Sequence, residues 1–79
     1  MGAYYSETPD YLVSERIDLL LNHGYFGYKV IKVTFDDHRG QVIAVARNGK
    51  GHVLSAYGET EDDACIQLID LIDITVDAY

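Results

Sequence analysis

Residues 58–79 read GETEDDACIQLIDLIDITVDAY, and this stretch decides the fold because an apolar stripe and an acidic stripe run along it side by side. At 100° per residue, the spacing of the two stripes predicts a helix that begins near Thr60 and ends between Ile72 and Thr75. The apolar side carries Ala64, Cys65, Leu68, Leu71 and Ile72. The acidic side carries Glu59, Asp62, Asp63, Asp70, Asp73 and Asp77. We expect the first side to be buried and the second to face water or a partner.

A second helix is predicted near the N-terminus, from Pro9 to Asn22. Thr8 can cap it, proline suits the first helical position, and Asp10 complements the helix dipole. Gly24 provides a left-handed terminator after the last turn. The repeat of apolar residues predicts a buried face made of Val13, Ile17, Leu20 and Leu21.

Three segments between the helices alternate in polarity and are rich in β-branched and aromatic residues, so we expect strands. They are Tyr28–Phe35, Gln41–Arg47 and His52–Tyr57. Turn residues at 36–40 and 48–51 join them into an antiparallel meander. In the first strand, strict alternation places Ile31, Val33 and Phe35 on one face and Tyr28, Val30 and Lys32 on the other. Tyr28, Val30 and Tyr57 are then expected on the face turned away from the helices.

These elements predict an α+β fold in the order α-β-β-β-α. It would be a two-layer sandwich in which two helices pack on one face of a three-stranded antiparallel sheet. A chain of 79 residues has room for one domain, residues 1–79. Residues 1–7 show no periodic pattern and are expected to form a loose arm.

The charge distribution favours a basic partner. The formal net charge is −7, which disfavours direct binding of this chain to nucleic acid. All six lysines and arginines lie between Arg16 and Lys50, whereas seven acids and no base follow from Glu59 onward. No apolar run is long enough to span a membrane, and the single Cys65 excludes an internal disulfide. We expect a cytoplasmic setting.

No residue pattern points to catalysis or to a cofactor. His23, His38 and His52 lack the close spacing of metal ligands, and Cys65 falls on the apolar side of the last helix. Phosphate-binding glycine loops and nucleophile motifs are absent from the sequence. The sequence therefore predicts a non-enzymatic domain without a metal or cofactor.

The acidic side of the last helix is the most specific feature, and Ile66 projects into the middle of it. An apolar residue among acids suggests the centre of a contact, with acids supplying complementary charge. The predicted partner-binding residues are Asp62, Asp63, Ile66, Asp70, Asp73 and Asp77. The alternative is a solvated face that keeps the domain soluble, its first-turn acids serving the helix dipole.

The segment from Gly58 to Ala64, with Leu68 after it, resembles the entry to the final helix of double-stranded-RNA-binding domains. That resemblance implies the same α-β-β-β-α fold. The family has two lysines that clamp phosphates where this chain has Glu61 and Asp62. The reversed charge implies that the fold carries over and RNA binding does not.

Gly58, Thr60 and Ala64 also resemble the Gly-x-Thr-x-x-x-Ala pattern of HicB-type antitoxins. That family lacks the leading helix predicted here, and this chain lacks its usual Pro and Gly-Cys residues. The small size, acidity and tyrosine content are similar to those of phage inhibitors such as anti-CRISPR proteins, which present carboxylates in place of phosphates.

These observations predict an acidic protein-binding domain that inhibits a basic protein, such as a nuclease or nucleic-acid-binding complex, by occupying its binding surface. The alternatives are a HicB-like antitoxin and a structural module that forms a homodimer through its open sheet face or a strand edge.

Overall fold

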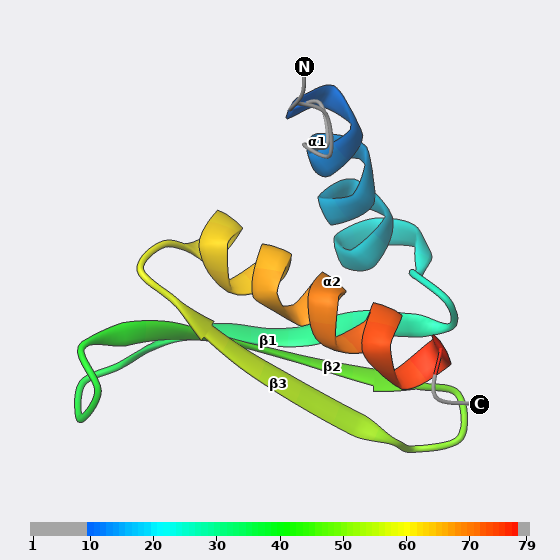
Figure 1. Cartoon of the computed structure of the whole chain (residues 1–79). Coiled ribbons are helices and arrows are strands. Elements are labelled where there is room, and N and C mark those ends of the chain that lie inside the picture. The colour runs from blue at the N-terminus through cyan, green and yellow to red at the C-terminus, as the bar shows by residue number, and fades with distance from the viewer. Residues whose placement is uncertain (1–9, 78–79) are drawn as a thin grey trace.

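Both helices lie on one side of a three-stranded antiparallel sheet (Figure 1). The computed structural model describes residues 10–77. The elements are α1 (Asp10–Asp18), the π-helical turn η2 (Leu19–His23), β1 (Tyr28–Asp36), β2 (Gln41–Asn48), β3 (Val53–Gly58) and α2 (Glu61–Asp77). The α+β class and the order α-β-β-β-α are therefore confirmed. The predicted arm, residues 1–7, and the predicted helix start at Thr8 and Pro9 lie outside the described residues.

The sheet has the order β1-β2-β3, and small residues line the face that the helices cover. Ala44 and Ala46 of β2 are fully buried, and Ala56 of β3 is 7% exposed. Because these side chains are short, α2 can lie close along β2 and β3, where Leu68 and Ile72 fill the space above the sheet. α1 instead rises away from the sheet, and its C-terminal extension η2 contacts β1 (Figure 1).

A β-bulge lies between Val30 and Lys32 of β1. Because of it, each side chain before the bulge points to the sheet face opposite to the one that strict alternation predicts. Val33 pairs with the buried Ala44, and before the bulge Val30 pairs with the buried Ala46. Val30 and Val33 therefore lie on the same face although three positions separate them. The prediction that Tyr28 and Val30 lie on the open face is wrong. Tyr28 is 4% exposed and belongs to the core, because the extra residue breaks the two-residue period on which that prediction rested.

The C-terminal end of α1 widens into η2. There the N–H of Gly24 donates to the carbonyl of Leu19, five residues earlier. Leu20 is fully buried as predicted, but Leu21 is 37% exposed. The prediction that Leu21 is buried is wrong because the wider turn advances each side chain by a smaller angle than an α-helix does.

α2 begins where Gly58 and Thr60 bring the chain back over the sheet. The N–H of Asp63 donates to Oγ1 of Thr60 at 3.1 Å, which identifies Thr60 as the cap. Along the helix, Leu71 is 36% exposed, whereas Ile69 is 4% exposed. The predicted apolar stripe is therefore corrected at one position: its centre passes between Cys65 and Ile72, and Leu71 falls at its edge.

Candidate functional site

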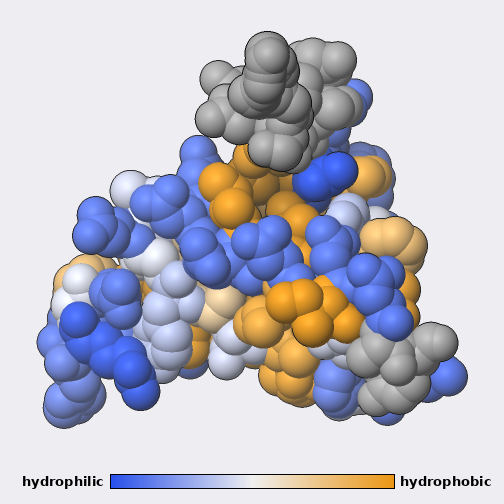
Figure 2. All heavy atoms as spheres, in the orientation of Figure 1, coloured by the Kyte–Doolittle hydropathy of each residue, from blue (hydrophilic) through white to orange (hydrophobic). Residues whose placement is uncertain are grey.

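The outward side of α2 carries three carboxylates in a straight line. Asp63, Asp70 and Asp77 are spaced by seven residues, so they project in nearly the same direction, and all three are exposed. At 1.5 Å per residue the line spans about 21 Å. Figure 2 shows a hydrophilic band across this side of the molecule, with hydrophobic atoms on both sides of it.

Apolar side chains border the line of carboxylates on the side away from α1. Ile74 is 65% exposed and Leu71 is 36% exposed. We define the acidic face as Asp63, Asp70, Asp77, Leu71 and Ile74. It combines an extended line of negative charge with an exposed apolar contact area.

The structure places the six predicted partner-binding residues in three different surroundings. Asp62, Asp63, Asp70 and Asp77 are exposed, whereas Ile66 and Asp73 are half-buried. Ile66 turns toward α1, where it lines a small cavity of about 90 Å³ together with Val13, Arg16 and the exposed Asp70. The most exposed apolar residue beside the carboxylates is therefore Ile74, which the sequence reasoning missed. Its position could have identified it, because a residue four after Asp70 and three before Asp77 lies on the same side of a helix as both.

Asp73 is held by the fold. Its Oδ1 accepts a hydrogen bond of 2.7 Å from the hydroxyl of Tyr25, in the turn that precedes β1. Burial, followed by this hydrogen bond to a carboxylate, raises the pKa of Tyr25 to about 12. Asp73 therefore anchors α2 to the turn, while Asp63, Asp70 and Asp77 remain exposed.

The carboxylates of α2 have no basic partner within ion-pair distance among the side chains that the structure describes. The side-chain pairs found within that distance are His23 with Asp18 at 3.7 Å and Arg39 with Asp36 at 3.9 Å. The first-turn acids gain from the helix dipole and from the N-terminal N–H groups. Asp70 and Asp77 lie beyond that turn, so the helix dipole gives no reason for their presence.

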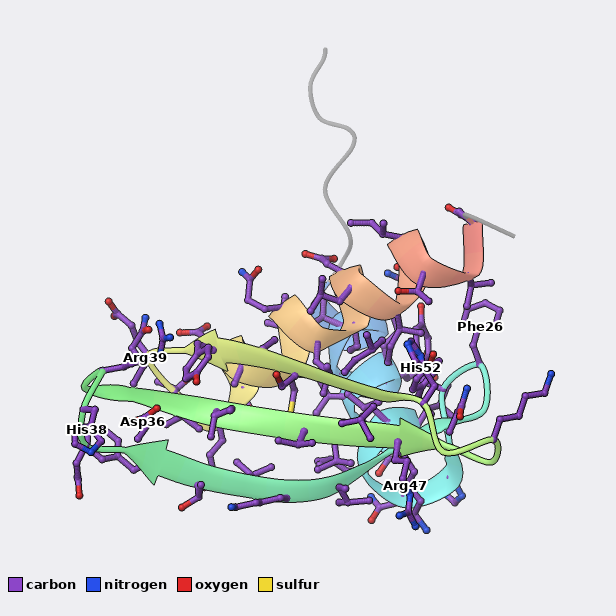
Figure 3. All side chains as sticks on the ribbon, turned by 90° about the horizontal axis from the view of Figure 1, so that it is seen from below. Phe26, Asp36, His38, Arg39, Arg47 and His52 are labelled. Atoms are coloured by element: carbon purple, nitrogen blue, oxygen red, sulfur yellow. The ribbon has the colours of Figure 1, made fainter. Side chains whose placement is uncertain are left out.

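A second concave region lies where the hairpin between β2 and β3 approaches the end of α2. Its volume is about 490 Å³, and its lining includes Phe26, Tyr28, Lys50 and His52. The hydroxyl of Tyr28 and Nδ1 of His52 are 2.6 Å apart. Figure 3 shows Phe26 and His52 at the same end of the sheet, far from His38 and Arg39. The sequence reasoning missed this region because the bulge in β1 is what turns Tyr28 toward it.

Cys65 is 2% exposed, and burial, followed by the nearby charges of Asp62 and Glu61, raises the pKa of its thiol. Such a thiol is a poor nucleophile at neutral pH. Within residues 10–77, no group of three or more His, Cys, Asp or Glu side chains is placed to hold a metal ion.

Comparison with protein-family models, with curated proteins and with solved structures finds no match to this chain. Of the helices that the structure describes, neither is long and apolar enough to cross a membrane. The candidate site therefore stands on its geometry, as an exposed face of α2 that carries both charge and apolar area.

Proposed function

We propose that this domain is a non-enzymatic protein-binding module whose acidic face docks on a basic surface of another protein. The observation that supports this proposal is the outward line of Asp63, Asp70 and Asp77 beside the exposed Ile74. Charges that extend over about 21 Å match the length of a basic groove better than a point contact. The apolar residues supply the water-excluding area that an interface needs at its centre.

The proposed partner is a protein whose groove binds nucleic acid. A row of carboxylates on a rigid helix presents negative charge at regular intervals, as a phosphate backbone does. By occupying the groove, the domain would act as an inhibitor. Each exposed ion pair contributes about 1 kcal/mol or less, so several pairs and the apolar centre would act together, and binding would weaken as salt rises.

The experiment is a capture from lysate of the cells that encode the protein, at low and at high salt, followed by displacement with nucleic acid. The test variant is Asp70→Asn/Asp77→Asn, which leaves the first-turn acids and the Tyr25–Asp73 bond intact. The matched control is Glu15→Gln/Asp37→Asn, because it removes two exposed acids from other parts of the molecule. Ile74→Ser tests the apolar part of the face.

We expect the wild type and the control to retain a basic protein that salt releases and that duplex RNA or DNA displaces. The Asp70→Asn/Asp77→Asn and Ile74→Ser variants should retain at least tenfold less of it. Equal retention by the test variant and the control would refute the proposal, because the acidic face would then be a solvated surface. A retained partner that nucleic acid fails to displace would refute the inhibitor role.

A further inference from the structure

The second face of the sheet is left uncovered by the residues that the structure describes (Figure 3). On β2, Ile43, Val45 and Arg47 alternate with the buried Ala44 and Ala46, so they point to this open face. We define the basic sheet face as these three residues with their neighbours on β1, β3 and the adjoining turn. Those neighbours are Lys29, Lys32, Arg39, Val53 and Tyr57.

This face concentrates positive charge on a molecule whose net charge is −7. It holds four of the six lysines and arginines. Arg39 is placed at one end of the sheet and Arg47 at the other (Figure 3). Arg39 stacks on the Tyr57 ring, with its guanidinium carbon 4.6 Å from the ring centroid, and it pairs with Asp36 at 3.9 Å.

At the opposite end of the face, no carboxylate in the described part of the chain lies within ion-pair distance of a lysine or arginine. Lys29 and Arg47 are direct partners across β1 and β2, and both are exposed. Lys32 lies beyond the bulge on the same face, paired with Val45. Like charges directly opposite each other on neighbouring strands destabilise a sheet. An anionic surface laid against this face would relieve that repulsion.

The acidic face of α2 complements the basic sheet face in charge, length and apolar content. Gln41 to Arg47 along β2 spans about 20 Å at roughly 3.3 Å per residue, against about 21 Å from Asp63 to Asp77. Both faces have apolar side chains beside their charges. These are Ile43, Val45 and Val53 on the sheet, and Leu71 and Ile74 on the helix.

We propose that the basic sheet face binds the acidic face of a second copy of this chain, so that copies associate head to tail. Within one molecule the two faces lie on opposite sides of the sheet layer (Figure 1). Each copy can therefore bind one neighbour through α2 and another through the sheet, and the assembly grows as an open stack. This inference rests on the proposed function of the acidic face, and a basic partner bound there would end the stack.

Nucleic acid is the competing occupant of a basic sheet face. The net charge of −7 opposes it, because a phosphate backbone would be repelled by most of the molecule's surface. A second copy carries the same net charge of −7, but its acidic face adds Leu71 and Ile74, which can pack on the apolar side chains of the sheet as a phosphate backbone cannot.

The first measurement is sedimentation velocity of the wild type across a range of protein concentrations, at low salt and at about 1 M salt, where the screening length falls to about 3 Å. We expect the average mass to rise continuously with concentration at low salt and to return to that of one chain at high salt. A wild type that stays monomeric at low salt, or whose mass stops at a dimer, would overturn the proposal.

Charge reversal provides the second test. Asp70→Lys/Asp77→Lys reverses the charge of the line on α2, and Lys29→Glu/Arg47→Glu reverses the charge at the end of the sheet face where Arg39 is absent, so each variant alone should associate at least tenfold more weakly. Mixing the two variants restores opposite charges at the two reversed places, and association should return. Both variants remain net negative, so attraction between the molecules as wholes does not explain this result. Circular dichroism of each variant provides the folding control.

Failure of the mixture to associate, with both variants folded, would overturn the proposal. So would a monomeric wild type in which Lys29→Glu/Arg47→Glu abolishes retention of a single-stranded oligonucleotide, since the sheet face would then bind nucleic acid. These measurements contain no other protein. Loss of self-association therefore leaves the proposed function standing, whereas a failed capture together with self-association would show that the acidic face binds a second copy and no other protein.

Discussion

The hydroxyl of Tyr25 donates a hydrogen bond to Oδ1 of Asp73 at 2.7 Å, and this bond joins the turn before β1 to the C-terminal half of α2 across 48 positions of the chain. Tyr25 is 9% exposed, so the bond is partly shielded from water. Tyr25→Phe should lower the free energy of unfolding by about 1.5 kcal/mol, a typical value for a bond to a charged group. Urea unfolding of Tyr25→Phe, Asp73→Ala and the double variant measures the coupling. Additive losses would show that the bond does not stabilise the fold.

The same pair predicts a loss of stability at high pH. The pKa of Tyr25 is raised from 10 to about 12 in the folded chain, because burial and the bond to Asp73 disfavour the phenolate. A raised pKa means that the folded state holds this proton more tightly than the unfolded state does. The contribution is complete below pH 10 and is lost as the pH rises toward 12. Unfolding of the wild type and of Tyr25→Phe between pH 9 and 12 checks this, and parallel curves would contradict it.

Gly58 lies where the chain leaves β3 and turns into α2, and it is predicted to tolerate no side chain. A Cβ at this position would clash with the backbone nitrogen of Ala64 and would lie 2.6 Å from the carbonyl carbon of Asp63. Gly58→Ala should therefore cost about 3 kcal/mol, because backbone atoms of α2 would have to move. Gly49→Ala is the control, since nothing lies within 4 Å of a Cβ there. Thermal unfolding of the two variants gives the comparison, and equal losses would refute this account.

The buried thiol of Cys65 is predicted to be unreactive in the folded chain. Burial and the charges of Asp62 and Glu61 raise its pKa, and the side chain is 2% exposed. Modification by a thiol reagent at neutral pH should be at least a hundredfold slower than in denaturant. Labelling rates followed by mass spectrometry check this. Rapid labelling of the native chain would show that the helix opens locally.

Local sequence patterns predicted the helices and strands. The tertiary structure then changed which side chains are exposed and which are buried. The strands, the hairpin turns and the start of α2 near Thr60 follow from residue types that act over a few positions. The facing of Tyr28 depends on a bulge, and the bulge depends on the pairing of β1 with β2, which no single segment encodes. The same limit applies to the candidate site. Helical spacing placed Asp70 and Asp77 outward, but only the packed structure brings Tyr25 to Asp73.

Phe26 occupies a backbone conformation that an asparagine would accept more easily. It has φ +48° in a two-residue turn between Tyr25 and Tyr28. The backbone N–H of each of these two tyrosines donates a hydrogen bond to the carbonyl of the other. Phe26 is 63% exposed. A bulky residue in the left-handed region costs about 1 kcal/mol, and such turns favour asparagine before glycine. Against this, the ring makes an edge contact with Tyr25 at 5.0 Å between centroids.

Phe26→Asn should therefore leave the free energy of unfolding unchanged or raise it by up to about 1 kcal/mol. Phe26→Leu loses the aromatic contact but keeps the backbone cost, so it should be less stable than Phe26→Asn. Urea unfolding of the two variants decides the order. If it holds, the exposed ring is not retained for stability, and the concave region that Phe26 shares with Lys50 and His52 becomes the place to search for a ligand. If Phe26→Asn is the less stable variant, the ring is a packing residue.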